Sequence, residues 1–176
     1  MLKTAMIKPD DVRIKLGGAK TEIFTPLLET EVIYIPFFQV GKNINEVLKK
    51  MLVDKIEGKC IKDGFVEPGS TNIITISNGT LLNKYAKYVV GYQAKVCFPV
   101  EQMVIECTAK NITKAGIKAT LTKYTKTPMV IFVARDHHYN NDKFNSIEEN
   151  DVIRVKIIGQ RFEINDEYIS VIAEIH

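Results

Sequence analysis

The sequence is poor in the features that usually reveal a compartment or a chemistry. It has no tryptophan and only three cysteines among 176 residues. No stretch approaches the roughly 18 consecutive apolar residues that a membrane-spanning helix needs. The charged stretch 1–20 also lacks the apolar core of a secretion signal. We therefore expect an intracellular protein that makes no contact with membrane.

The chain has too few cysteines for a disulfide framework. Cys60, Cys97 and Cys107 are odd in number, far apart and without paired spacing. Disulfide scaffolds and zinc sites need cysteines in recognisable pairs. The sequence thus predicts three reduced thiols, each acting as a small apolar residue.

Motifs of independent catalysis are missing too. No glycine-rich phosphate loop, nucleophile elbow or magnesium-binding set of carboxylates is present, so we predict no catalytic residue, cofactor or metal ion. One alternative is a metal-dependent enzyme built on Asp136, His137 and His138, with Asp142 nearby. Adjacent side chains of an extended segment point apart, and no second pair completes a tetrahedral set. A solvated loop is therefore the preferred interpretation.

What is present is the composition of an ordinary folded protein. Hydrophobic residues make up 45% of the chain and charged residues 26%. The length suffices for one sizeable core or for two small modules. The net charge of +3 gives only mild attraction to polyanions, so any RNA contact should be weak and salt-sensitive.

The first half predicts a small antiparallel sheet packed on one helix. The run 30–38 (TEVIYIPFF) is rich in β-branched and aromatic residues and predicts a strand that ends near Pro36. A helix is predicted from Ile44 to about Glu57, with Asn43 as its side-chain cap and Gly58 as its stop. Its apolar stripe has helical spacing. The stripe consists of Ile44, Val47, Leu48, Met51, Leu52 and Ile56.

Short strands should follow the helix. We expect them over 60–66, 71–77 and 88–98, with Asn78-Gly79 as a hairpin turn. The stretch 1–22 shows no sustained periodicity and is predicted to be an N-terminal extension without assigned function. The predicted modules are thus 23–99 and 100–176.

The second half predicts a barrel. Five strand-like runs cover 103–112, 116–124, 129–135, 152–162 and 168–175. Five strands are the number in an OB-type barrel. In the fourth run Ile153, Val155 and Ile157 alternate with polar residues, so the odd-numbered face should point inward. The predicted class is α+β, mostly β.

Several segments, in this order, resemble one known family. They are LLETEVIYIPFF (27–38), NEVLKKMLVDKIEGKC (45–60), KDGFV (62–66), YVVGYQAKVCFPVE (88–101), FVAR (132–135) and DVIRVKIIGQR (151–161). The chain resembles the stalk subunit of multisubunit DNA-directed RNA polymerases, the family of the seventh subunit of RNA polymerase II and its archaeal counterpart. Its divergent composition suggests a homologue from a large DNA virus.

The resemblance implies a noncatalytic subunit whose first, tip module docks on the large core subunits and whose barrel contacts nascent RNA. It also implies a small helical partner of the fourth-subunit type. Such a protein would work in the nucleus or, if viral, in a cytoplasmic viral factory and the virion. The alternative is a free-standing OB-fold RNA-binding protein of translation or RNA decay.

Candidate RNA contacts combine positive charge with aromatic faces on which bases stack. They are Lys118, Lys123, Tyr124, Phe132, Arg135, Arg154 and Lys156. Two alternatives stay open: Phe132 points into the barrel, or the basic residues are ordinary solvated charges.

Candidate core-docking residues lie in the first module. Phe37 and Phe38 are consecutive, so in a strand one of them would need cover from outside the sheet. The predicted set is Phe37, Phe38, Lys59, Lys62, Asp63, Gly64 and Phe65.

Overall fold

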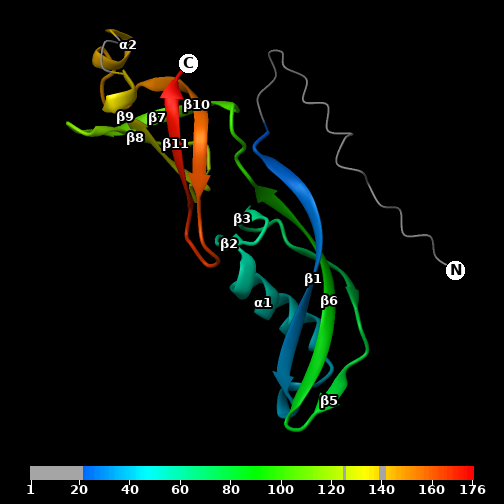
Figure 1. Ribbon diagram of the computed structural model, residues 1–176. Coiled ribbons are helices and arrows are strands. Elements are labelled where there is room, and N and C mark those ends of the chain that lie inside the picture. Colours follow the sequence, from blue (N-terminus) through cyan, green and yellow to red (C-terminus); the bar gives the residue numbers. More distant parts are fainter. Residues whose placement is uncertain (1–21, 125, 139–141) are drawn as a thin grey trace, which may run out of the picture.

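The computed structural model describes residues 22–124, 126–138 and 142–176, which form two bodies arranged end to end (Figure 1). One is a six-stranded sheet with helix α1, and the other is a closed five-stranded barrel. The predicted α+β, mostly β class is confirmed. Apart from Glu22, the predicted N-terminal extension lies outside the described residues.

Two long strands form the spine of the first body. Strands β1 (Phe24–Pro36) and β6 (Tyr85–Cys97) pair antiparallel over 13 residues each. The remaining elements are η2 (Phe37–Gln39), α1 (Ile44–Ile56), β2 (Cys60–Ile61), β3 (Gly64–Val66), β4 (Asn72–Ile76) and β5 (Thr80–Leu82). The other edge of β6 pairs, along its length, with the three short strands β3, β4 and β5.

Helix α1 covers one face of this sheet, as its apolar spacing predicted. Leu48, Leu52 and Ile56 are buried and pack with Ile33 and Ile35 of β1. The positive φ of Gly58 ends the helix as expected.

Two details of the helix prediction are wrong. Met51 is exposed, because it lies at the border of the apolar stripe. Asn43 makes no side-chain capping bond among the described residues. Its backbone carbonyl instead accepts hydrogen bonds from the amides of Glu46 and Val47, both at 3.1 Å.

The short strands also differ from the prediction. The run 60–66 is a tight hairpin of β2 and β3, because the chain reverses at Lys62-Asp63. Asn78-Gly79 is not a hairpin turn, since β4 and β5 both pair with β6. The chain instead reverses at Asn83-Lys84, where Asn83 has a φ of 55°.

The second body is the predicted barrel. Its strands are β7 (Val104–Ile112), β8 (Gly116–Thr120), β9 (Met129–Ala134), β10 (Val152–Arg161) and β11 (Ile169–Ile175). They close in the order β10-β11-β9-β8-β7, and β9 and β11 are parallel. Ile153, Val155 and Ile157 point inward as predicted. Strand β8 ends earlier than expected, at Thr120.

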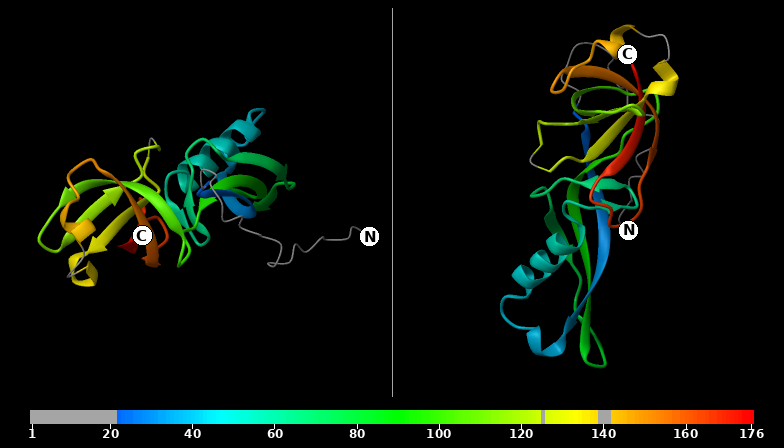
Figure 2. Two further views of the ribbon diagram at one scale, coloured as in Figure 1. Left: turned by 90° about the horizontal axis from the view of Figure 1, so that it is seen from above. Right: turned by 90° about the vertical axis from the view of Figure 1, so that its left-hand side faces the viewer.

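The bodies are joined by more than the β6–β7 connection. Cys60, Phe65 and Cys97 of the sheet belong to the hydrophobic core of the barrel. The amide of Cys60 donates to the Asp166 carbonyl, and the amide of Asn165 donates to the Cys60 carbonyl, both at 2.8 Å. The turn between β10 and β11 is therefore fastened to β2, where the two bodies meet in Figure 2.

His138 lies at the far end of the barrel, in η3 (Arg135–His138), and the solvated-loop interpretation is wrong for it. It is buried with 6% exposure. Its Nδ1 lies 2.9 Å from the Ala134 carbonyl, and Nε2 accepts the Ile175 amide at 2.9 Å. The ring stacks on Phe144 of α2 (Asp142–Asn145). His138 therefore closes the barrel end.

Candidate functional site

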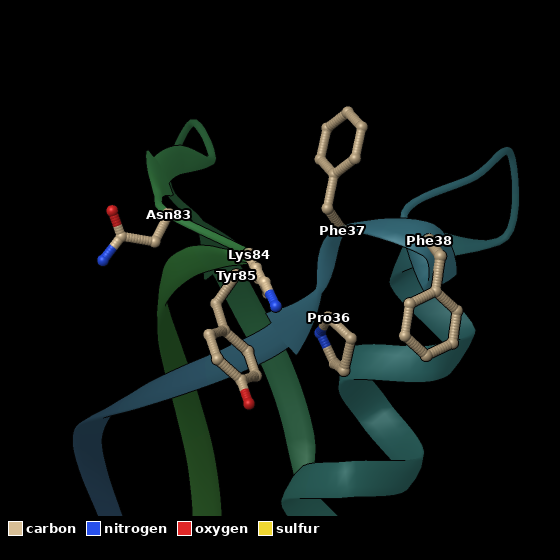
Figure 3. A pocket seen from close by; sticks show the side chains of 6 residues that line it. All are labelled: Pro36, Phe37, Phe38, Asn83, Lys84 and Tyr85. Carbon is tan, nitrogen blue, oxygen red and sulfur yellow. The ribbon is translucent and has the colours of Figure 1, made fainter.

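The end of the sheet farthest from the barrel exposes aromatic rings. Phe37 and Phe38 are 58% and 84% exposed. They lie in η2 rather than in a strand, and the Phe37 amide donates to the Lys84 carbonyl at 2.9 Å. This bond holds η2 beside the β5–β6 turn. The two rings point away from each other, next to the hollow shown in Figure 3.

The apolar surface continues from this hollow onto the sheet face opposite α1. Val32 lies directly across from Val89, and Pro36 lies across from Tyr85. Leu82 pairs with Tyr85 from the other side. We call this surface the aromatic end. It consists of the exposed residues Val32, Tyr34, Phe37, Phe38, Leu82, Tyr85 and Val89. Contiguous exposed apolar surface of this kind is typical of interaction sites.

The other predicted docking residues lie at the opposite end of the sheet. Phe65 pairs with Cys97, whereas Pro36 pairs with Tyr85. At roughly 3.3 Å per residue along β6 the two sites are about 40 Å apart. Phe65 therefore does not share one surface with Phe37 and Phe38.

Gly64 and Phe65 are structural residues. Phe65 has 0% exposure, so its ring fills the core between the bodies. Gly64 has a φ of 121°, and a Cβ there would lie 2.3 Å from the Cys97 carbonyl oxygen. Glycine is needed because β6 passes so close.

The charged residues of this group bind within the chain. Lys62 forms an ion pair with Glu29 at 2.7 Å, and its hydrogen bond lowers the pKa of that carboxyl group. Lys59 donates to the Asp54 carbonyl at 2.9 Å, close to the end of α1. One carboxylate oxygen of Asp63 is buried and accepts no hydrogen bond among the described residues, but it lies 3.9 Å from the Lys62 ammonium group.

The barrel places two predicted RNA contacts side by side. Lys118 of β8 lies directly across from Phe132 of β9. Phe132 is 37% exposed between the buried Ile131 and Val133, so it points outward. A Cβ on Gly116 would come within 2.9 Å of the Phe132 ring, so glycine lets the ring lie close to β8. The pair offers an aromatic face beside a positive charge.

Arg135 lies next to this pair but is held by the barrel. Its Nε donates to the Lys114 carbonyl at 3.0 Å, and its guanidinium lies 5.0 Å from the Phe144 ring centre. Arg135 and Lys114 border a shallow hollow together with Ile112 and Thr113. Lys114 was missed by sequence reasoning. Its place in the loop between the first two barrel strands, a ligand-binding loop of OB folds, could have indicated it.

The remaining predicted RNA contacts lie elsewhere on the barrel. Arg154 pairs with Glu106 at 3.1 Å, and Lys156 pairs with Glu174 at 3.2 Å. Both lie on β10, where they contact β7 and β11.

Lys123 and Tyr124 follow β8, at the end of the barrel that faces the sheet. Tyr124 packs edge-on against Phe24 with ring centres 5.2 Å apart. Burial raises the pKa of Tyr124. The structure therefore groups Lys118, Phe132 and Arg135 and leaves the other four predicted residues apart.

The cysteines are unsuited to nucleophilic chemistry. All three are free and buried. Burial, followed by the charge of Asp166, raises the pKa of Cys60 to about 11. Burial raises the pKa of Cys97 and of Cys107 to about 12. The thiols stay protonated at neutral pH, and a thiolate is what reacts.

Metal ligands do not cluster anywhere in the part of the chain that the structure describes. Within it, no three His, Cys, Asp or Glu side chains group into a metal site. Over the same residues, every helix is too short or too polar to cross a membrane.

Comparison with known proteins finds a relative that is named as a polymerase subunit. No protein-family model matches the chain. It is similar to a protein of Acanthamoeba polyphaga mimivirus named "Putative DNA-directed RNA polymerase subunit L376", with 28% identity over 169 residues. The match covers 86% of this chain and 81% of the relative, so it includes both the sheet and the barrel.

Proposed function

We propose that the chain is a noncatalytic stalk subunit of a DNA-directed RNA polymerase, probing emerging RNA with its barrel and docking on the core enzyme with its sheet. The observation that carries the proposal is the match to the mimivirus polymerase subunit along both bodies. An OB barrel fastened to a helix-bearing sheet is also the order of modules that the resemblance to stalk subunits implies. A small helical partner of the fourth-subunit type would complete the stalk.

The aromatic end supports the docking step. Phe38 is 84% exposed, and two phenylalanines in sequence remain uncovered by the rest of the described chain. Burying such rings removes apolar surface from water at roughly 25 cal/mol per Å². The large core subunits of the polymerase would supply that cover, at the end of the stalk opposite the barrel.

The barrel face supports the RNA step. Phe132 provides a ring for base stacking, and Lys118 provides a cation for the neighbouring phosphate. With a net charge of +3 the contact should be weak and salt-sensitive. Catalysis resides in other subunits.

Affinity purification of the tagged chain from its native source tests the docking step. We expect the large polymerase subunits to copurify with the wild-type chain and to be lost with Phe37→Ala/Phe38→Ala. Ile164→Ala is the matched control, because Ile164 is similarly exposed but lies in the β10–β11 turn. Recovery of the wild-type chain alone would contradict the proposal.

Titration with a labelled uridine oligonucleotide tests the RNA step. Phe132→Ala should weaken binding by about 1–3 kcal/mol, the contribution of one stacked base. Ile172→Ala is the control, because Ile172 lies directly across from Phe132 on β11 but has no ring. Tight RNA binding at physiological salt without polymerase association would favour the free-standing RNA-binding protein instead.

A further inference from the structure

Acidic residues are missing from the chain segments that build the aromatic end. Neither 32–45 nor 68–100 contains an aspartate or glutamate, although the chain has 21 of them. The first segment ends β1 and leads through η2 into α1, and the second contains β4, β5 and β6. These two segments therefore carry positive charge only; Glu31, which pairs with Lys55, and Glu46 flank the first of them.

Three lysines supply that charge near the exposed rings. Lys84 lines the hollow beside Phe37 and Phe38. Lys87 of β6 pairs with Tyr34 of β1, and Lys42 follows η2 in the connection to α1.

These lysines differ from others in the same body. Lys55 and Lys62 pair with Glu31 and Glu29, each at 2.7 Å. Across the described residues, Lys42, Lys84 and Lys87 have no ion-pair partner. The aromatic end thus combines uncovered apolar side chains with positive charge that the chain itself does not neutralise.

We propose that the aromatic end binds an acidic segment of a partner polypeptide, with apolar side chains against the rings and carboxylates beside Lys84 and Lys87. This rests on the proposed docking function and specifies the chemistry of the docked segment. Rim charges of this kind steer association, select the partner and make binding salt-dependent.

A polypeptide fits this surface better than a nucleic acid does. Val32, Leu82 and Val89 are aliphatic, so they gain by burying apolar side chains but offer no face for base stacking. The two acid-free segments contain no arginine either, and arginine is the residue suited to bidentate phosphate recognition.

The test measures binding of short labelled peptides to the full chain by fluorescence anisotropy. One peptide alternates pairs of leucine and glutamate, and its counterpart has glutamine in place of glutamate. A labelled uridine oligonucleotide is the third probe. The variants are Lys84→Glu/Lys87→Glu and the control Lys95→Glu. Lys95 lies on the same face of β6 as Lys87 but near the barrel, so its change alters charge away from the aromatic end.

We expect the glutamate peptide to bind at low salt and the glutamine peptide to bind at least about tenfold more weakly. The double variant should lose about tenfold in affinity for the glutamate peptide, while the control keeps it. Equal binding of both peptides would overturn the proposal, and so would equal losses in the two lysine variants. Tighter binding of the oligonucleotide, lost in the double variant, would assign the surface to nucleic acid instead.

The polymerase experiment separates this proposal from the proposed function. If the large polymerase subunits still copurify with Lys84→Glu/Lys87→Glu, the proposed docking function stands and the proposal of an acidic partner segment is wrong. If the chain binds the glutamate peptide selectively but does not copurify with polymerase, the proposal of an acidic partner segment stands and the proposed stalk function is wrong.

Discussion

The two ends of the β1–β6 sheet use phenylalanine in opposite ways. At the barrel end Phe65 has 0% exposure and belongs to a core shared by both bodies. At the aromatic end Phe38 has 84% exposure. Both residues are phenylalanines of the first body, so the type of residue alone does not separate a buried ring from an exposed one.

The difference lies in what each end meets within the chain. The barrel end is covered by the β10–β11 turn, fixed by two backbone hydrogen bonds to Cys60. At the aromatic end the chain turns back at η2 and at Asn83-Lys84, and the described residues leave the rings in solvent. Among the described residues, the chain itself covers the barrel end of the sheet and leaves the aromatic end exposed.

The largest expected effect contrasts the two phenylalanines directly. Phe65→Ala should lower the free energy of unfolding by about 3–5 kcal/mol, because it removes a buried ring and leaves a cavity. Phe38→Ala should change it by no more than about 0.5 kcal/mol. Urea denaturation measures both values. Equal effects would show that the aromatic end is structural as well.

Gly64 sharpens the same contrast through the backbone. Gly64→Ala should destabilise by roughly 2–4 kcal/mol, because it adds strain at positive φ and a clash with the Cys97 carbonyl. Gly41, near the aromatic end, lacks a positive φ and has no described atom within 4 Å of the place where a Cβ would lie. Gly41→Ala should therefore be tolerated, and thermal unfolding of the two variants compares them.

His138 extends the comparison to the end of the barrel. His138→Ala should lower the free energy of unfolding by about 1–3 kcal/mol, since the Ile175 amide loses its acceptor and Phe144 loses its stacking partner. Urea denaturation measures this change. His137, exposed and adjacent, is the control and should cost little when changed to alanine. Similar values for the two variants would contradict the structural role of His138.

The prediction with the smallest effect at neutral pH is a loss of stability in alkali. In the folded chain burial raises the pKa of Cys97 and of Cys107 from 9.0 to about 12. The unfolded chain loses these protons first, so the contribution is fully present below pH 9.0 and is lost as the pH rises to about 12. The free energy of unfolding, measured by urea denaturation at several pH values, should fall less steeply over this range in Cys97→Ala/Cys107→Ala than in the wild type. A parallel fall would assign the alkaline loss to other groups, such as Tyr92, whose pKa burial also raises to about 12.

Periodic segments were predicted well from the sequence. The alternation of Ile153, Val155 and Ile157 predicted which face of β10 fills the barrel, and the structure buries all three. The helix over 44–56 was predicted from its stripe and from Gly58. In both cases the burial pattern repeats with the local backbone period, so neighbouring residues contain the information.

Short elements and single side chains were predicted less well. Asn78-Gly79 is a strong turn signal, yet the chain reverses at Asn83-Lys84, because β4 and β5 both add to β6. Gly79 instead lets the Tyr88 ring lie close, since a Cβ there would meet that ring at 2.8 Å. The pairing of distant strands outweighed the local preference.

The candidate surfaces show the same division. Phe37 and Phe38 could be singled out because two consecutive aromatic rings in a strand-like segment cannot both face one core. The neighbouring Lys118 and Phe132 come together only through the register of β8 on β9. Arg154 and Lys156 lie apart from them, on β10, where each pairs with a glutamate.

The order of residues by itself determined where the helix and the barrel strands form, because these depend on hydrophobic periods that repeat within one element. Only the tertiary structure decided that Phe65 is buried while Phe38 is exposed, and that His138 closes the barrel rather than lying in solvent. Those outcomes depend on which distant segments pack against each side chain, and such contacts form only when the whole chain has folded.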